Sequence, residues 1–161
     1  NELSPWTNKE FGPAEGHEYM EFIVKQIKPM MDSAYRTLPD RTHTAIMGSS
    51  MGGLISHYAL THYSDIFSKA GIFSPSYWYA DEVYEFVKSN PLPTDSRLFI
   101  LVGLKEDDGG ILKGAQRMYD QLIALGHPKE NINFILDEEG EHNEAFWAKH
   151  FGDAVKWMFD N

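Results

Sequence analysis

The chain has 161 residues with 24 acidic and 14 basic side chains, a formal net charge of −10, and no cysteine. The acidic balance makes nucleic acid a poor partner, because a phosphate backbone would be repelled. The absence of cysteine excludes disulfides, thiolate metal sites and a cysteine nucleophile. No apolar run approaches the roughly 20 residues of a membrane helix. We therefore expect a single domain, 1–161, that binds neither nucleic acid nor membrane and resides in a reducing, cytoplasmic compartment.

An N-terminal loop is followed by an alternation of helices and strands. Residues 1–17 are polar and contain two prolines, which is typical of a loop. In 18–31 apolar side chains recur at helical spacing, and Pro29 should kink or end that helix. The remaining elements are predicted in chain order as strand 42–47, helix 51–63, strand 68–73, helix 81–88, strand 98–102, helix 111–125, strand 132–136 and helix 144–159.

This fourfold alternation of strand and helix predicts an α/β fold. We expect a mostly parallel sheet of about four strands with helices on both faces. In the last helix, Trp147, Phe151 and Met158 are expected to face the sheet. In such a sheet the functional residues gather at the carboxyl ends of the strands.

The segment 48–52 reads GSSMG and matches the pattern G-x-S-x-G. A short apolar strand leads into it and an apolar-periodic helix follows, which is the setting of a nucleophile elbow. A side chain at Gly48 or Gly52 should collide with its neighbours in so tight a turn, and Ser50 should adopt a strained backbone conformation. Ser50 is then the candidate nucleophile, and the backbone N–H of Met51 is the candidate oxyanion donor. The alternative is a glycine-rich turn without chemistry, which this context disfavours.

A serine nucleophile needs a base, and His142 is the best-placed histidine. It follows the last predicted strand and precedes the last helix, which is where the histidine of an α/β-hydrolase is found. A packing or surface role is the better interpretation for the other six, which are His17, His43, His57, His62, His127 and His150.

The acid that would orient His142 should follow the strand 98–102. Three adjacent carboxylates stand there, and we favour Glu106, with Asp107 as the alternative and Asp108 third. The chain order serine, acid, histidine is that of α/β-hydrolases. The competing interpretation is a solvated acidic turn.

The segment 73–79, FSPSYWY, follows the second strand and should also lie at the carboxyl edge. Tyr77 and Trp78 are the candidate substrate-binding residues, although ordinary packing under a loop would explain the same aromatic residues. The sequence contains no metal-binding or phosphate-binding motif, so we expect no metal and no cofactor.

The sequence resembles the putative-esterase family of the α/β-hydrolase superfamily, which includes siderophore, feruloyl and acetyl-xylan esterases and esterase D. The segments that carry the resemblance are 35–37, 45–54, 65–67, 73–76 with Trp78, 102–103 with Glu106, and Gly140 with His142. The resemblance implies a triad of Ser50, His142 and an acid near Glu106. It also implies a serine carboxylic-ester hydrolase that acts on a small-molecule ester through an acyl-enzyme.

The resemblance departs from the family at the start of the chain. Family members have several strands, and a His-Gly loop that supplies a second oxyanion donor, before the segment that corresponds to 3–6. Nothing in this chain matches them, so the resemblance implies the C-terminal part of such an enzyme. Strand 42–47 would then have an uncovered edge, and we expect a homo-oligomer or pairing with a separate N-terminal piece. Two functional alternatives follow: an acyltransferase on the same triad, or a catalytically poor fragment that self-associates.

Overall fold

The structure is a computed structural model that describes residues 2–106 and 110–160. Its centre is a four-stranded sheet in the order β1-β2-β3-β4, and all three strand pairs are parallel. The strands are β1 (Ala45–Ser49), β2 (Lys69–Phe73), β3 (Arg97–Gly103) and β4 (Ile132–Asp137). The predicted parallel α/β sheet is therefore confirmed.

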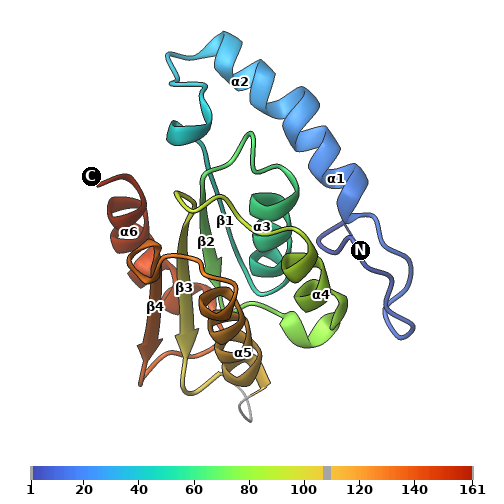
Figure 1. Ribbon diagram of the computed structural model, residues 1–161, viewed down its shortest axis with the longest axis vertical. Coiled ribbons are helices and arrows are strands. Elements are labelled where there is room, and N and C mark those ends of the chain that lie inside the picture. The colour runs from blue at the N-terminus through green and yellow to red at the C-terminus, as the bar shows by residue number, and fades with distance from the viewer. Residues whose placement is uncertain (1, 107–109, 161) are drawn as a thin grey trace.

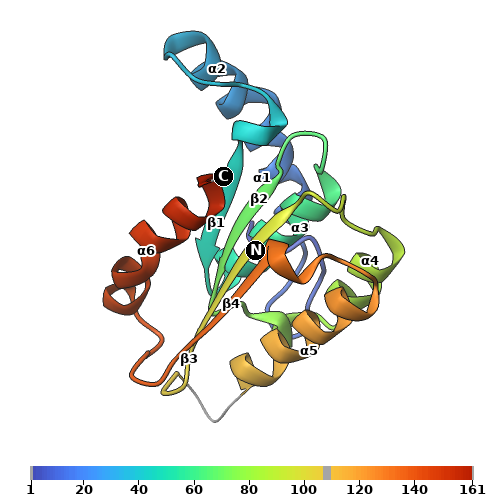
Figure 2. The ribbon, with the colours of Figure 1, turned by 60° about the vertical axis from the view of Figure 1, so that its left-hand side comes forward.

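Helices cover both faces of this sheet. The helices described are α1 (Gly16–Phe22), α2 (Lys28–Ala34), α3 (Met51–His62), α4 (Glu82–Ser89), α5 (Gly110–Ala124) and α6 (Glu144–Phe159). Figure 2 shows α6 on one face and α3, α4 and α5 on the other. No helix in the described part of the chain has both the length and the apolar character that a membrane crossing requires.

The burial of the strands follows from this layering. Every residue of β2 is buried, and β3 is buried from its second residue onward, because helices cover both faces of these central strands. The residues of β1 are all half-buried. Among the described residues β1 pairs only with β2, so its outer edge is open.

The N-terminal helix differs from the prediction. It begins at Gly16, passes through a π-helical turn at Ile23–Ile27 and continues as α2 to Ala34. Pro29 neither ends nor breaks it, because Pro29 lies in the first turn of α2, directly after the π-helical turn. A proline is tolerated in a first helical turn, where its missing N–H costs little. Figure 1 shows α1 and α2 as one long helix that extends past the amino ends of the strands.

The first strand also begins later than predicted. Residues Arg41–His43 form a short 3₁₀ turn, and the Asp40 side chain caps it by accepting from the Thr42 N–H at 3.0 Å. The strand therefore begins at Ala45 and runs to Ser49, directly before the GSSMG turn.

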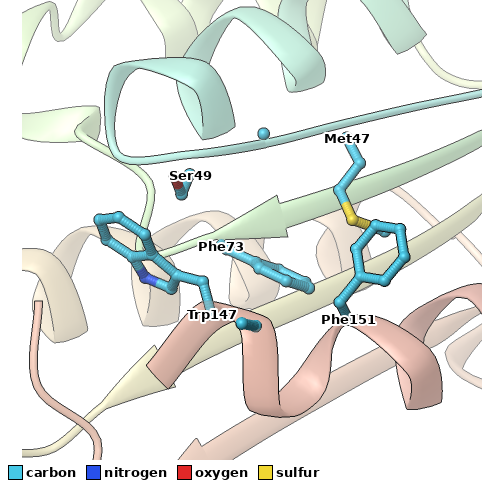
Figure 3. A pocket seen from close by; sticks show the side chains of 7 residues that line it. Met47, Ser49, Phe73, Trp147 and Phe151 are labelled. Carbon is cyan, nitrogen blue, oxygen red and sulfur yellow. The ribbon is translucent and has the colours of Figure 1, made fainter. Parts of the chain in front are cut away.

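The core has one apolar layer on each face of the sheet. The larger layer lies under α3, α4 and α5, and the smaller one lies under α6. Met158 is buried in the smaller layer, and Trp147 packs against it. Phe151 points toward β1 as expected, but its side chain stays 55% exposed. It lies beside Met47 at the open edge of β1, where no other described strand covers it (Figure 3).

Candidate active site

Ser50 occupies a strained turn between β1 and α3. Its φ is 57° and its ψ is −120°, a conformation that residues other than glycine rarely adopt. Backbone hydrogen bonds hold it: the Ser50 N–H donates to Phe73 O at 2.9 Å, and Ser50 O accepts from the Ser76 N–H at 3.1 Å. The turn is thus fastened to the end of β2, and the strain that the sequence pattern predicts is present.

The two glycines of the turn have different roles. A Cβ at Gly48 would lie 2.4 Å from Gly52 O, so only glycine fits at position 48. A Cβ at Gly52 would meet no atom within 4 Å, so the expected collision at that position is wrong. A side chain at position 48 would collide with the backbone of Gly52, whereas a side chain at position 52 would point into open space.

His142 reaches Ser50 from the loop between β4 and α6. Its Nε2 lies 3.0 Å from Ser50 Oγ. The loop is fastened to the segment after β3, because the Lys105 N–H donates to Gly140 O at 2.9 Å. The backbones of Gly103 and Gly140 touch so closely that a Cβ on Gly103 would lie 2.3 Å from Gly140 O. The loop that carries His142 therefore lies directly against the end of β3.

Glu106 lies behind His142, at the carboxyl end of β3. Its Oε2 is 3.5 Å from His142 Nδ1, and its side chain is only 1% exposed. Its other oxygen, Oε1, accepts from the Gly103 N–H at 2.8 Å and from the Ser74 hydroxyl. With Nδ1–H toward Glu106, Nε2 is free to accept the Ser50 proton. The alternative acid Asp107, like Asp108, lies outside the described residues.

The remaining predicted site residues, which are Met51, Tyr77 and Trp78, differ in their exposure and surroundings. Met51 is the first residue of α3, so its backbone N–H belongs to the first turn, where N–H groups lack a partner inside the helix. Trp78 is 57% exposed. Tyr77 is 1% exposed, and its hydroxyl lies 2.7 Å from His57 Nδ1 inside the core.

The placement of Tyr77 is at odds with its predicted contact with substrate. Burial lowers the pKa of His57 to about 3 and raises the pKa of Tyr77 well above its usual value. The short 3₁₀ turn Tyr77–Tyr79 explains the difference from Trp78, because successive side chains in such a turn point in different directions.

Three further side chains contact the site, and the sequence had predicted no site role for them. Ser76 Oγ lies 3.2 Å from Ser50 Oγ. Trp147 Nε1–H donates to Ser74 Oγ at 2.8 Å, and the Trp147 ring meets the His142 ring edge-on at a centroid distance of 5.0 Å. The sequence indicated a substrate contact for the aromatic residues of segment 73–79. Its two serines, Ser74 and Ser76, make the contacts instead.

An open, mostly apolar pocket of about 420 Å³ adjoins the site (Figure 3). It lies between α6 and the strands β1 and β2. Trp147 links the pocket to the site, because it lines the pocket and also contacts His142. The lining residues are Met47, Gly48, Ser49, Phe73, Trp147, Ala148 and Phe151.

The serine follows β1, the carboxylate follows β3 and the histidine follows β4, which is the chain order of the α/β-hydrolase fold. The parallel sheet, with these three residues in this order along the chain, is typical of α/β-hydrolases. Over residues 5–158 the chain matches the family described as putative esterase, and it belongs to that family.

Individual relatives are similar over most of this chain. The uncharacterized protein YbbA of Bacillus subtilis (strain 168) is 24% identical over 99% of this chain and 68% of its own length. The iron(III) enterobactin esterase of Escherichia coli (strain K12) is 28% identical over 86% of this chain and 32% of its own length. The crystal structure of the BES protein from Bacillus cereus superposes with a TM-score of 0.82 at 20% identity, over 99% of this chain and 63% of that chain. The chain thus spans about a third of the enterobactin esterase and under two thirds of the Bacillus cereus chain.

Proposed function

We propose that this protein is a serine carboxylic-ester hydrolase that works through an acyl-enzyme, with Ser50, His142 and Glu106 as its triad. The observation that supports this most directly is the 3.0 Å approach of His142 Nε2 to Ser50 Oγ. A hydroxyl at that distance from an imidazole nitrogen can pass its proton to the ring as the oxygen attacks a carbonyl carbon. The family and the named esterase among its relatives agree with ester chemistry.

The proposed reaction has two halves. In the first, Ser50 Oγ bonds to the ester carbonyl carbon, His142 takes the serine proton, and the same proton then leaves with the alkoxide as an alcohol. In the second, His142 takes a proton from water, the hydroxide attacks the acyl-enzyme, and the acid is released as Ser50 regains its proton. In both halves the buried Glu106 carboxylate stabilises the imidazolium of His142.

Two further residues have proposed roles in binding. The oxyanion of each tetrahedral intermediate would accept from the Met51 N–H, since the N-terminus of α3 favours negative charge at that point. Trp78 is proposed to contact the substrate, because its exposed ring lies two residues beyond Ser76, whose hydroxyl touches Ser50.

Assembly is a separate part of the proposal. The outer edge of β1 has unpaired backbone groups among the described residues, and the exposed side chains of Phe151 and Phe159 flank pockets that also include β1 residues. Open strand edges of this kind pair readily with another chain. We propose that this edge pairs with a second copy of the chain or with a separate N-terminal piece.

Hydrolysis of p-nitrophenyl acetate and butyrate tests the proposed function. Ser50→Ala and His142→Ala should each lower kcat by about 10⁴-fold or more, as triad removals do. Ser49→Ala is the matched control, because it removes the neighbouring hydroxyl and should leave kcat within about twofold. Activity that survives in Ser50→Ala would overturn the nucleophile. Adding an alcohol separates the acyltransferase alternative, since an ester product would then accumulate in place of the acid.

A further inference from the structure

The buried carboxylate of Glu106 is held from behind by a chain of hydrogen bonds. The Trp147 Nε1–H donates to Ser74 Oγ at 2.8 Å, and the Ser74 hydroxyl donates to Glu106 Oε1. The Gly103 N–H donates to the same Oε1 at 2.8 Å. Two donors therefore occupy one carboxylate oxygen, and the other, Oε2, faces His142 Nδ1 at 3.5 Å.

The direction of the protons in this chain follows from the chemistry of its members. An indole N–H can only donate, and a carboxylate can only accept. Ser74 Oγ must accept from Trp147, so its own proton is left to point at Glu106. A chain of hydrogen bonds ordered in one direction strengthens each of its members in a buried setting, and the side chains of Ser74 and Glu106 are almost fully buried.

The backbone of Ser74, like that of Ser50, has a positive φ. Its φ is 46°, and Ser50 and Ser74 are the only non-glycine residues with positive φ in the part of the chain that the structure describes. They follow the adjacent strands β1 and β2, and the Ser74 N–H is held by Leu101 O at 2.7 Å. Glycine would adopt this conformation without strain. A serine there supplies the hydroxyl that reaches Glu106, and such strain persists where the surroundings enforce it.

We infer that Ser74 and Trp147 are positioning residues for the triad: together they turn the Glu106 carboxylate so that Oε2 meets His142 Nδ1. This rests on the proposed function, in which Glu106 is the acid. Trp147 also packs its ring edge-on against His142, so one side chain contacts the base and, through Ser74, holds the acid. Trp147 Nε1 and Ser74 Oγ bond to each other and to Glu106. Losing either group should therefore change kcat, by slowing proton transfer through His142, more than it changes KM.

Steady-state kinetics on p-nitrophenyl butyrate test the inference. Ser74→Ala removes the donor, and Trp147→Phe removes the indole N–H but keeps a ring beside His142. Ser74→Ala should lower kcat by about 10- to 100-fold, the range expected for a lost hydrogen bond to a charged group. Trp147→Phe loses a bond to the neutral Ser74 hydroxyl and should lower kcat by about 3- to 10-fold. KM should stay within about twofold in both variants. Ser68→Ala is the matched control: Ser68 is also buried and stands at the opposite end of β2, and its kcat should not change.

The same substitutions in a Glu106→Gln background separate positioning from a general structural role. If Ser74 and Trp147 act through Glu106, Ser74→Ala and Trp147→Phe should each change kcat by less than about twofold once the carboxylate is gone. Losses of the same size in both backgrounds would overturn the inference. Should Ser74→Ala unfold, as its melting temperature beside that of Ser68→Ala will show, Trp147→Phe decides alone.

The failure of the inference is distinguishable from the failure of the proposed function. A large loss of kcat in Glu106→Gln together with wild-type kcat in Ser74→Ala and Trp147→Phe would overturn the inference and leave the triad standing. An unchanged kcat in Glu106→Gln would overturn Glu106 as the acid and the inference with it.

Discussion

Replacing Gly103 by alanine should disable the site although Gly103 contributes no side chain to it. Gly103 ends β3, and its N–H donates to Glu106 Oε1. Its Cα faces the loop that holds His142, and the added Cβ would lie 2.3 Å from Gly140 O and 2.4 Å from Gly140 C. Both of these are backbone atoms, so no side-chain rotation can relieve the contact.

The size of the effect follows from these distances. Ordinary van der Waals contact begins at 3.4 Å, so the two backbones must separate by about 1 Å. A displacement of about 1 Å between reacting groups costs about 100-fold in rate, and His142 lies two residues from the displaced Gly140. Overpacking of this kind also costs about 1–3 kcal/mol of stability. We therefore expect kcat to fall about 100-fold in Gly103→Ala while the protein stays folded.

The assay is hydrolysis of p-nitrophenyl butyrate with a thermal melt in parallel. Gly152→Ala is the matched control, since a Cβ there meets no atom within 4 Å and Gly152 lies inside α6. It should keep full activity and gain up to about 1 kcal/mol, because alanine is the better helix former. Wild-type kcat in Gly103→Ala would show that the Gly103–Gly140 contact does not set the position of His142.

Three more predictions follow from the structure. A fluorophosphonate probe should label Ser50 and not Ser49, and label that remains in Ser50→Ala, located by peptide mass spectrometry, would contradict the assignment. The Lys149 ammonium, with His150, holds the pKa of Asp137 far below its usual value. A depressed pKa adds stability above the unfolded value of about 3.9, and that stability is lost as pH falls through the folded value. Asp137→Asn should thus lower the melting temperature at pH 7 but progressively less below about pH 4, whereas an equal loss at every pH would contradict this. Light scattering across dilution should find an assembly larger than the 18.4 kDa chain that weakens when lysine is placed on β1; a monodisperse, fully active monomer would refute the proposed edge pairing.

Local patterns in the sequence were sufficient for the α/β class and the position of the serine turn. Strand and helix periodicities depend on neighbours a few residues apart, and the burial of β2 and β3 between two layers of helices is already visible in their apolar runs. The GSSMG turn is equally local, because the contact that excludes a side chain at Gly48 comes from Gly52. The position of His142 was predictable for a related reason, because its place between the last strand and the last helix is a matter of chain order.

The N-terminal helix shows where local rules were not enough. Pro29 reads as a helix breaker, yet the helix runs on to Ala34 because a π-helical turn places the proline in a new first turn. The aromatic run 73–79 shows the same limit. Its composition indicated a lining for the substrate, and the 3₁₀ turn sends Tyr77 into the core while Trp78 faces outward.

Only the tertiary structure decided what surrounds Glu106. Sequence left Glu106 beside two other carboxylates, and the structure places the Glu106 side chain against Ser74, which lies 32 residues away along the chain. Trp147, which completes the contact, is 73 residues from Ser74. A parallel sheet brings the carboxyl ends of its strands to one edge, so loops remote in sequence meet there. Hydrogen bonds between those loops depend on strand register and helix packing, which no short stretch of sequence specifies.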